Sequence, residues 1–300
     1  RIETHIHRTP VLQSRQLDKI AGTQIVFKCE NFQRMGAFKM RGAMNAVLRL
    51  TDSQRAKGVV THSSGNFAQA LALAAKNVGT SAWIVMPSDA PQVKKDAVRG
   101  YGGQIIECEP NVQAREETAE HVRAQHDATF LHPFNDDDVI TGQGTAGLEL
   151  LQDHPDLDVL MAPVGGGGLI SGCALAAHHF GINCITVGGE PTAVNDAARS
   201  MASGQIETNG TATTIADGLR TNLGDKTFPV IQDHVDRIIC VDEDEIVSAM
   251  KLIWERMKIV IEPSCAVPFA ALLREKDAFA GRKVGIVLSG GNVDLSRLPF

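Results

Sequence analysis

The sequence predicts an α/β protein that contains two open, mostly parallel twisted sheets flanked by helices. From residue 58 onward, short β-branched runs alternate with amphipathic, often alanine-rich segments of helical length, a pattern typical of β-α-β units. Four glycine-rich turns follow predicted strands, at the edge where open parallel sheets bind ligands. A length of 300 residues corresponds to roughly two domains.

The strands are predicted from short apolar runs, and the helices from apolar residues that recur on one helix face. The predicted strands cover 59–62, 82–86, 104–108, 159–164, 184–189, 237–241 and 284–288. The predicted helices include 67–77, 93–101, 113–125 and 243–257. Neither a repeat nor a linker is visible, and we assign 1–55 plus 136–300 to a large domain and 56–135 to a small one.

The composition excludes several classes of protein. The chain is 43% hydrophobic and 21% charged, which excludes disorder. A net charge of −6 and only 5% aromatic residues argue against nucleic acid as a partner. The longest stretch without Asp, Glu, Lys or Arg is 159–189, but Pro163 and the glycines at 165–168 break it. No membrane-spanning helix is therefore predicted.

The N-terminal segment predicts a cytoplasmic protein, and the cysteines predict free thiols. The first ten residues, RIETHIHRTP, contain neither an apolar signal core nor an Arg- and Ser-rich transit helix. The six cysteines are scattered and form no CxxC pair or zinc spacing, so we expect six buried or half-buried free thiols.

The glycine run at 165–168 separates an apolar predicted strand from a predicted helix. Its N–H groups can fold around a phosphate at the helix N-terminus. Two other interpretations stay open at this point: a tight turn without a ligand, or an NAD-binding loop. The second rests on the spacing of Gly166, Gly168 and Gly172 and on Glu190 at the end of the next strand. A P-loop is excluded, because the chain contains no GxxxxGK[ST].

One lysine stands out as a candidate nucleophile. Lys39 is flanked by Phe38 and Met40 and lies between Gly36 and Gly42. An apolar setting lowers the pKa of a lysine and keeps its amine nucleophilic. This context makes Lys39 a candidate for Schiff-base formation rather than an ordinary surface charge.

Nine motifs, in this order along the chain, resemble those of fold-type II pyridoxal-phosphate (PLP) enzymes. The most similar branch contains serine racemase and the serine/threonine dehydratases. The motifs are IHRTPV at 6–11, the Lys39 segment, SSGN at 63–66, PVGGGGL at 163–169, EP at 190–191, IADG at 215–218, WERMK at 254–258, EPS at 262–264 and LSGGNVD at 288–294. The resemblance implies a tryptophan-synthase-β-like fold, PLP as cofactor and a homodimer.

The resemblance also implies roles for particular residues. Lys39 forms the Schiff base and takes the Cα proton, while Asn66 hydrogen-bonds the phenolic oxygen of the cofactor. Phe38 and Glu262 line the cofactor pocket, and Ser289 faces the pyridine nitrogen. The phosphate is held by main-chain amides of Gly165, Gly166, Gly167, Gly168 and Leu169.

The substrate and metal sites are implied in the same way. Ser63, Ser64 and Arg115 match positions around the substrate, and Ser64 matches the serine that handles protons on the face away from Lys39. Two carboxylates and a main-chain carbonyl match the Mg²⁺ or Ca²⁺ site of the family. These metal residues are Glu190, Val194 and Asp196.

The chain departs from the family at Phe67, where a histidine normally follows SSGN. An apolar ring there predicts a preference for an apolar β-substituent, as in threonine or phenylserine, and disfavours β-hydroxyaspartate. The function expected is a PLP-dependent dehydratase that converts a β-hydroxy-α-amino acid of the serine, threonine or phenylserine type into a 2-oxo acid and ammonia. The alternatives are an amino-acid racemase on the same scaffold and a non-catalytic or NAD-binding α/β protein.

Overall fold

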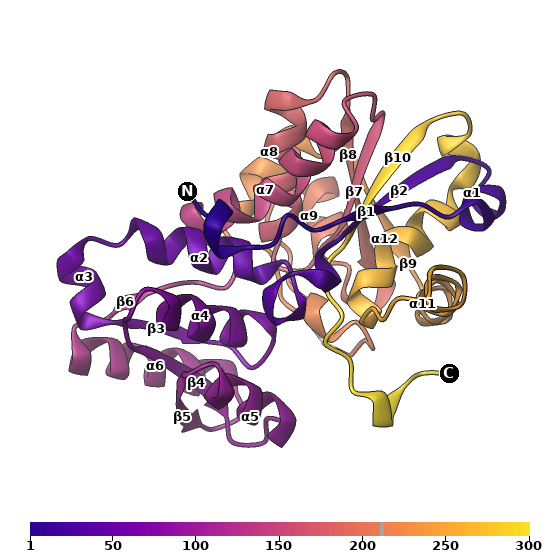
Figure 1. Cartoon of the computed structure of the whole chain (residues 1–300). Helices are drawn as coiled ribbons and strands as arrows, with labels where there is room; N and C mark the ends of the chain where they lie inside the picture. The colour runs from indigo at the N-terminus through magenta and orange to yellow at the C-terminus, as the bar shows by residue number, and fades with distance from the viewer. Residues whose placement is uncertain (211–212) are drawn as a thin grey trace. The chain divides into compact units, whose positions relative to one another are not determined.

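The contacts within the chain divide it into two compact units (Figure 1). A computed structural model describes residues 1–210 and 213–300. The small unit consists of residues 1–7 and 39–142, and the large unit of residues 8–38 and 143–300. Each unit contains one sheet, so the predicted fold class is confirmed.

The small unit has a four-stranded parallel sheet in the order β5-β4-β3-β6. Its strands are β3 (Val59–His62), β4 (Ala82–Pro87), β5 (Gln104–Cys108) and β6 (Thr129–Phe130). Its helices are η1 (Glu3–His5), α2 (Lys39–Arg49), α3 (Asp52–Lys57), α4 (Asn66–Asn77), α5 (Gln92–Gly100) and α6 (Val112–His126). Helix α4 packs on the sheet and against α2 and α5, and α6 covers the opposite face (Figure 1).

The large unit has a six-stranded sheet in the order β1-β2-β10-β7-β8-β9, in which only the β1–β2 pair is antiparallel. The strands are β1 (Val11–Leu12), β2 (Gln24–Cys29), β7 (Val159–Pro163), β8 (Ile185–Pro191), β9 (Arg237–Val241) and β10 (Lys283–Leu288). The α-helices are α1 (Arg15–Ala21), α8 (Gly168–Phe180), α9 (Asp196–Ser203), α10 (Thr227–His234), α11 (Glu243–Met257) and α12 (Pro263–Arg274). The 3₁₀ helices are η2 (Glu30–Phe32), η3 (Arg34–Gly36), η4 (Thr192–Val194), η5 (Asp217–Leu219), η6 (Lys276–Phe279) and η7 (Leu295–Arg297). Helix α7 (Asp137–Asp153) begins in the small unit and ends in the large one.

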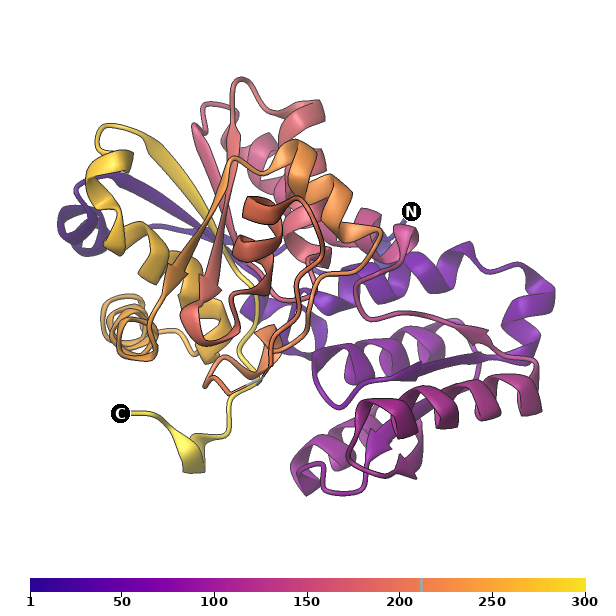
Figure 2. The same cartoon turned by 180° about the vertical axis from the view of Figure 1, so that it is seen from behind.

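Both faces of the large sheet are buried, as the apolar strands predict. Phe27 and Met161 belong to the core under α1, α11 and α12, and their neighbours Val26 and Leu160 belong to the core under α7, α8 and α10. This alternation is the period of two expected of a strand. Figures 1 and 2 show α11 and α12 on one face and α7 and α8 on the other.

The division into units differs from the predicted domains in three segments: 1–7, 39–55 and 136–142 lie in the small unit. The physical reason is α2, whose buried residues Met40 and Met44 pack along α4. On the same helix, Asn45 accepts a hydrogen bond from Arg1 and donates one to the carbonyl of Asp138. None of the helices in the described residues combines the length and hydropathy needed to cross a membrane.

Candidate active site

Lys39 is the first residue of α2 in the small unit. Its Nζ donates a hydrogen bond to the carbonyl oxygen of Pro133 at 2.7 Å. The same nitrogen lies 5.8 Å from the centre of the Phe67 ring, which belongs to the first turn of α4 and is 1% exposed. The amine predicted to react is therefore bordered by an aromatic ring and held by a main-chain carbonyl.

The SSGN segment forms the loop from β3 to the start of α4. Ser63 donates its N–H to the carbonyl of Val85, and its Oγ accepts the N–H of Gly65 at 3.4 Å. Gly65 is the N-cap of α4, and no side chain in the described chain caps this helix end. Ser64 and Asn66 are half-buried in this loop. A helix end of this kind favours an anionic group such as the carboxylate of an amino acid.

Arg115 lies on α6, which packs against β3. Its Nε is buried and has no hydrogen-bond partner among the residues described. Burial lowers the pKa of His62, the residue before Ser63, and the charge of Arg115 lowers that pKa further. A buried guanidinium nitrogen without a partner fits a carboxylate ligand.

In the large unit, the glycine run forms the turn from β7 into α8, and Gly165 to Gly168 are all buried. Gly167 has a φ of +87°, and a Cβ on it would lie 2.8 Å from the Cβ of Thr227. A Cβ on Gly165 would lie 2.9 Å from the Cα of Leu219. No described side chain caps the N-terminus of α8. The close packing requires glycine, and the uncapped amides suit the phosphate of PLP.

Thr227 fixes this turn, and sequence reasoning missed it. Its Oγ donates to the carbonyl of Gly166 at 2.9 Å and accepts the N–H of Gly224 at 2.9 Å. Thr227 is fully buried at the start of α10. The only signal in the sequence is a threonine at a helix start, which is too common to single out a functional residue.

Ser289 and Phe38 are neighbours in the large unit. Phe38 donates its N–H to the carbonyl of Ser289 at 3.0 Å, and an antiparallel bridge joins the adjacent residues Ala37 and Gly290. Glu262 donates its N–H to the carbonyl of Gly290 at 3.0 Å, and its carboxylate lies 2.8 Å from where a Cβ of Gly290 would be. Main-chain contacts thus bring Phe38, Glu262 and Ser289 together at the end of β10.

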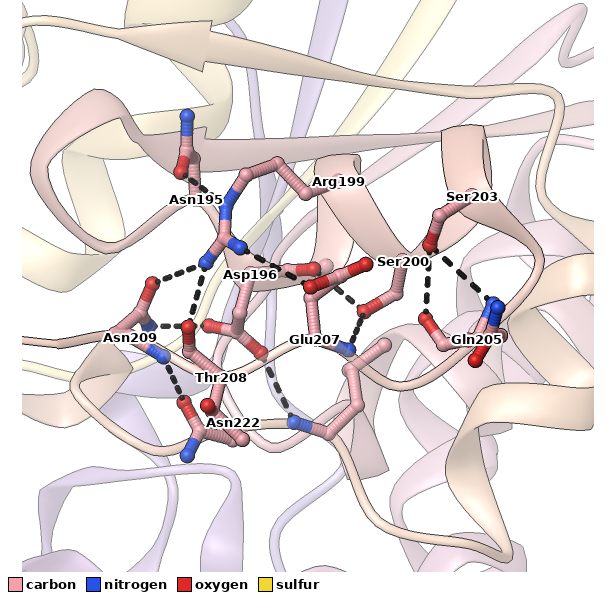
Figure 3. A network of polar contacts seen from close by, with 12 residues as sticks. Asn195, Asp196, Arg199, Ser200, Ser203, Gln205, Glu207, Thr208, Asn209 and Asn222 are labelled. Atoms are coloured by element: carbon pink, nitrogen blue, oxygen red, sulfur yellow. Dashed lines mark hydrogen bonds and ion pairs between the residues drawn. The ribbon is translucent and has the colours of Figure 1, made fainter.

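Glu190 and Asp196, the carboxylates predicted to bind metal, are both buried, and Figure 3 shows the polar network around Asp196. Glu190 accepts the N–H groups of Ala197 and Ala198, both at 2.9 Å. Asp196 accepts the side-chain amide of Asn209 at 2.5 Å and the N–H of Leu223 at 3.0 Å. Figure 3 shows how the network continues outward from Asn209 to Arg199, Glu207, Thr208 and Asn222.

Burial dominates the electrostatics of this acidic pair. Burial, together with the negative charge of Asp196, raises the pKa of Glu190 to about 8. Burial also raises the pKa of Asp196. Within the described residues, no three His, Cys, Asp or Glu side chains are arranged to hold a metal, so the structure does not show the predicted site. The carboxylate oxygens and the carbonyl of buried Val194 are of the chemical type that Mg²⁺ and Ca²⁺ bind.

The comparisons identify the class of protein. A family model described as "Pyridoxal-phosphate dependent enzyme" matches residues 2–290. The chain therefore belongs to the pyridoxal-phosphate-dependent enzymes, and its fold is that of fold type II. This membership excludes the alternative of a non-catalytic or NAD-binding protein.

The relatives indicate to which branch of the pyridoxal-phosphate-dependent enzymes the chain is similar. The chain is 49% identical over 300 residues to "beta-hydroxyaspartate dehydratase" of Paracoccus denitrificans (strain Pd 1222), which covers 100% of this chain and 95% of that protein. It is 48% identical over 302 residues to "Serine racemase" of Dictyostelium discoideum, covering 99% and 93%. The structure of maize serine racemase matches with a TM-score of 0.97 and 47% identity, covering 99% of this chain and 92% of that one. The predicted branch of the family is confirmed.

Proposed function

We propose that this chain is a PLP-dependent ammonia-lyase that converts a β-hydroxy-α-amino acid into a 2-oxo acid and ammonia. The observation that carries this proposal is the placement of Lys39, whose amine lies beside the Phe67 ring and on the Pro133 carbonyl. Phe38, the residue before Lys39, is hydrogen-bonded to Ser289. The relatives support dehydration as the reaction.

The chain offers a group for each part of the cofactor. When bound, PLP withdraws electrons from the substrate Cα and makes its proton easier to remove. Lys39 would attach the cofactor and would then accept the Cα proton, as an amine in an apolar setting can. Asn66 would hydrogen-bond the phenolic oxygen, Phe38 and Glu262 would line the cofactor pocket, and the amides of Gly165, Gly166, Gly167, Gly168 and Leu169 would hold the phosphate.

Ser289 is proposed to face the pyridine nitrogen of the cofactor. It is 2% exposed at the end of β10. A neutral hydroxyl leaves that nitrogen largely unprotonated, whereas a carboxylate partner would hold a proton on it. The weaker withdrawal of electrons disfavours transamination and leaves elimination of the β-hydroxyl accessible.

The small unit is proposed to bind the substrate carboxylate. Ser63 and Ser64 precede the uncapped start of α4, and Arg115 contributes a buried nitrogen without a partner in the described chain. Charge-assisted hydrogen bonds from these groups would orient the amino acid.

The candidate substrates differ from one another in the β-substituent. Phe67 presents an apolar ring beside the Lys39 amine, and we therefore propose that threonine or phenylserine is preferred. Two relatives carry hydroxyaspartate in their names, "beta-hydroxyaspartate dehydratase" and "L-threo-3-hydroxyaspartate ammonia-lyase". Hydroxyaspartate is therefore the competing substrate that the assay has to include.

The direct test is a panel of the L and D forms of serine, threonine, phenylserine and hydroxyaspartate, scored for 2-oxo acid. We expect release of 2-oxo acid and ammonia in equal amounts from at least one L isomer. No product from any of the eight compounds would contradict the proposal.

A second candidate function is racemisation, which Ser64 and the relatives named serine racemase favour. Racemisation needs a proton donor on the face of Cα opposite Lys39, and the Ser64 hydroxyl can supply it. In Ser64→Ala we expect loss of Cα epimerisation and of D-isomer turnover, with part of the L-isomer elimination kept. Equal loss for both enantiomers would assign Ser64 to binding instead.

Three accessory properties complete the proposal. Glu190, Asp196 and the carbonyl of Val194 bind Mg²⁺ or Ca²⁺ to stabilise the large unit. The enzyme is a homodimer, which light scattering on the purified chain tests. It resides in the cytoplasm, which is supported by the six cysteines: all are free, and they are buried or half-buried.

A further inference from the structure

The turn that holds Lys39 is built around a histidine. His132 Nδ1 accepts the main-chain N–H of Asn135 at 2.9 Å and that of Phe134 at 3.3 Å. An imidazole nitrogen that accepts carries no proton, so the neutral ring has its proton on Nε2. His132 therefore closes the 132–135 turn as a specific tautomer.

Three aromatic rings pack around the His132 ring. Its centre lies 4.5 Å from that of Phe134 in an edge-on arrangement, 5.9 Å from that of His62 and 6.1 Å from that of Phe130. These contacts come from the end of β3, from β6 and from the turn itself. The ring is thus positioned to accept the two N–H groups.

The residue enclosed by this turn is Pro133, whose carbonyl accepts the Nζ hydrogen bond of Lys39 at 2.7 Å. Proline fixes its own φ, and the two bonds to His132 fix the peptide units that follow it. The direction of the Pro133 carbonyl is therefore set by a side chain that the proposed chemistry does not use.

We propose that His132 is a positioning residue for Lys39, acting through the Pro133 carbonyl. The proposal rests on the proposed function, in which Lys39 accepts the Cα proton. The Pro133 carbonyl then binds an N–H of the resulting ammonium, and the Phe67 ring faces its charge. His132 thereby holds the protonated Lys39 amine in a position from which the proton can return to the substrate or pass to another group.

Two substitutions distinguish the contribution of the His132 hydrogen-bond acceptor from that of its aromatic ring. His132→Asn keeps an acceptor oxygen near the place of Nδ1 and removes the ring. His132→Phe keeps a ring against Phe134 and His62 and removes the acceptor. We would measure amide exchange of Phe134 and Asn135 in the PLP-free chain, acetylation of Lys39 relative to Lys95 in the same unit, and kcat and KM.

In His132→Phe we expect amide exchange about tenfold faster, because two hydrogen bonds are lost. We also expect Lys39 to be acetylated several times faster relative to Lys95, and kcat to fall about tenfold with KM nearly unchanged. His132→Asn should stay within about threefold of the parent in every measurement.

Parental exchange and acetylation in His132→Phe would overturn the proposal, as would an equal loss in His132→Asn. A ¹⁵N spectrum of the parent that shows a protonated Nδ1 on His132 at neutral pH would overturn it without any variant. A different measurement tests the proposed function. If that function is wrong, borohydride treatment of the PLP-loaded parent will leave Lys39 unlabelled, whatever the His132 measurements show.

Discussion

The main-chain N–H of Phe38 donates a hydrogen bond to the carbonyl oxygen of Ser289 at 3.0 Å. The neighbouring Ala37–Gly290 bridge and the bond from the Asn292 side chain to the carbonyl of Met35, at 2.8 Å, extend the contact. Phe38 is thus fixed to the end of β10, and Lys39 is the next residue in the chain. Phe38, the residue before the lysine proposed to carry the cofactor, is therefore held against Ser289, the residue proposed to face the ring nitrogen.

Ser289→Asp is expected to change the type of reaction. A carboxylate at this position would hold a proton on the pyridine nitrogen and strengthen electron withdrawal from Cα. The kcat for 2-oxo acid release should fall at least about tenfold, and transamination products should appear. Ser296→Asp, on the exposed 3₁₀ helix η7, is the matched control for an added charge. Unchanged rates and products in Ser289→Asp would remove Ser289 from the pyridine nitrogen.

Phe67→His is expected to shift substrate preference toward hydroxyaspartate. The buried ring favours an apolar β-substituent, and such a contact is worth roughly ten- to a hundredfold in selectivity. The measurement is kcat/KM for phenylserine, threonine, serine and hydroxyaspartate in parent and variant, with Phe67→Leu as an apolar control. If the parent already prefers hydroxyaspartate, or if the ranking survives the substitution, Phe67 does not select the substrate.

Removal of divalent cations is expected to destabilise the large unit. Glu190 and Asp196 are fully buried, and a cation would stabilise their ionised forms. Chelator should lower the melting temperature and the activity, and Mg²⁺ or Ca²⁺ should restore both. Glu190→Gln should make the protein indifferent to chelator and cation. A parent enzyme that contains no metal in elemental analysis and does not respond to chelator would eliminate the site.

The small unit should lose stability in acid through His62. Burial lowers the pKa of His62 from its ordinary value of 6.5, so the unfolded chain binds a proton at a higher pH than the folded one. The free energy of unfolding should therefore fall as pH drops through about 6.5, and the fall should end below the folded pKa. Urea unfolding between pH 5 and 8 should show a flatter profile in His62→Asn than in the parent. The same profile in both proteins would contradict this assignment, and His121→Asn, exposed on α6, serves as the control.

The bounds of the strands β3, β5 and β9 could be predicted to the residue, because each strand is a short run of mainly apolar, β-branched residues in the sequence. Strand β2 was missed because its apolar run is interrupted by Lys28, the fifth of its six residues. That lysine is fully buried and its charge is balanced by Glu149 at 2.6 Å, a partner 121 residues away. Helix α12 was missed because Pro268, in its interior, disfavours a helix locally, whereas packing on β8 and β10 retains it.

The candidate active site, like the fold, could be predicted from the sequence only in part. Motifs could locate Lys39 and the glycine run, because their residue types are unusual where they occur. Thr227 and Pro133 could not be found, because each acts through a main-chain or hydroxyl contact with a residue more than 50 positions away. Such contacts are visible only after the chain has folded.

The most direct test of the account is the identity of the lysine that carries the cofactor. The PLP-loaded enzyme is reduced with borohydride, digested and mapped by mass spectrometry, with Lys39→Ala as the control. The account predicts a phosphopyridoxyl group on Lys39 alone, and a Lys39→Ala protein that has neither the cofactor absorption band nor turnover. A label on another lysine, or a coloured and active Lys39→Ala protein, would contradict it.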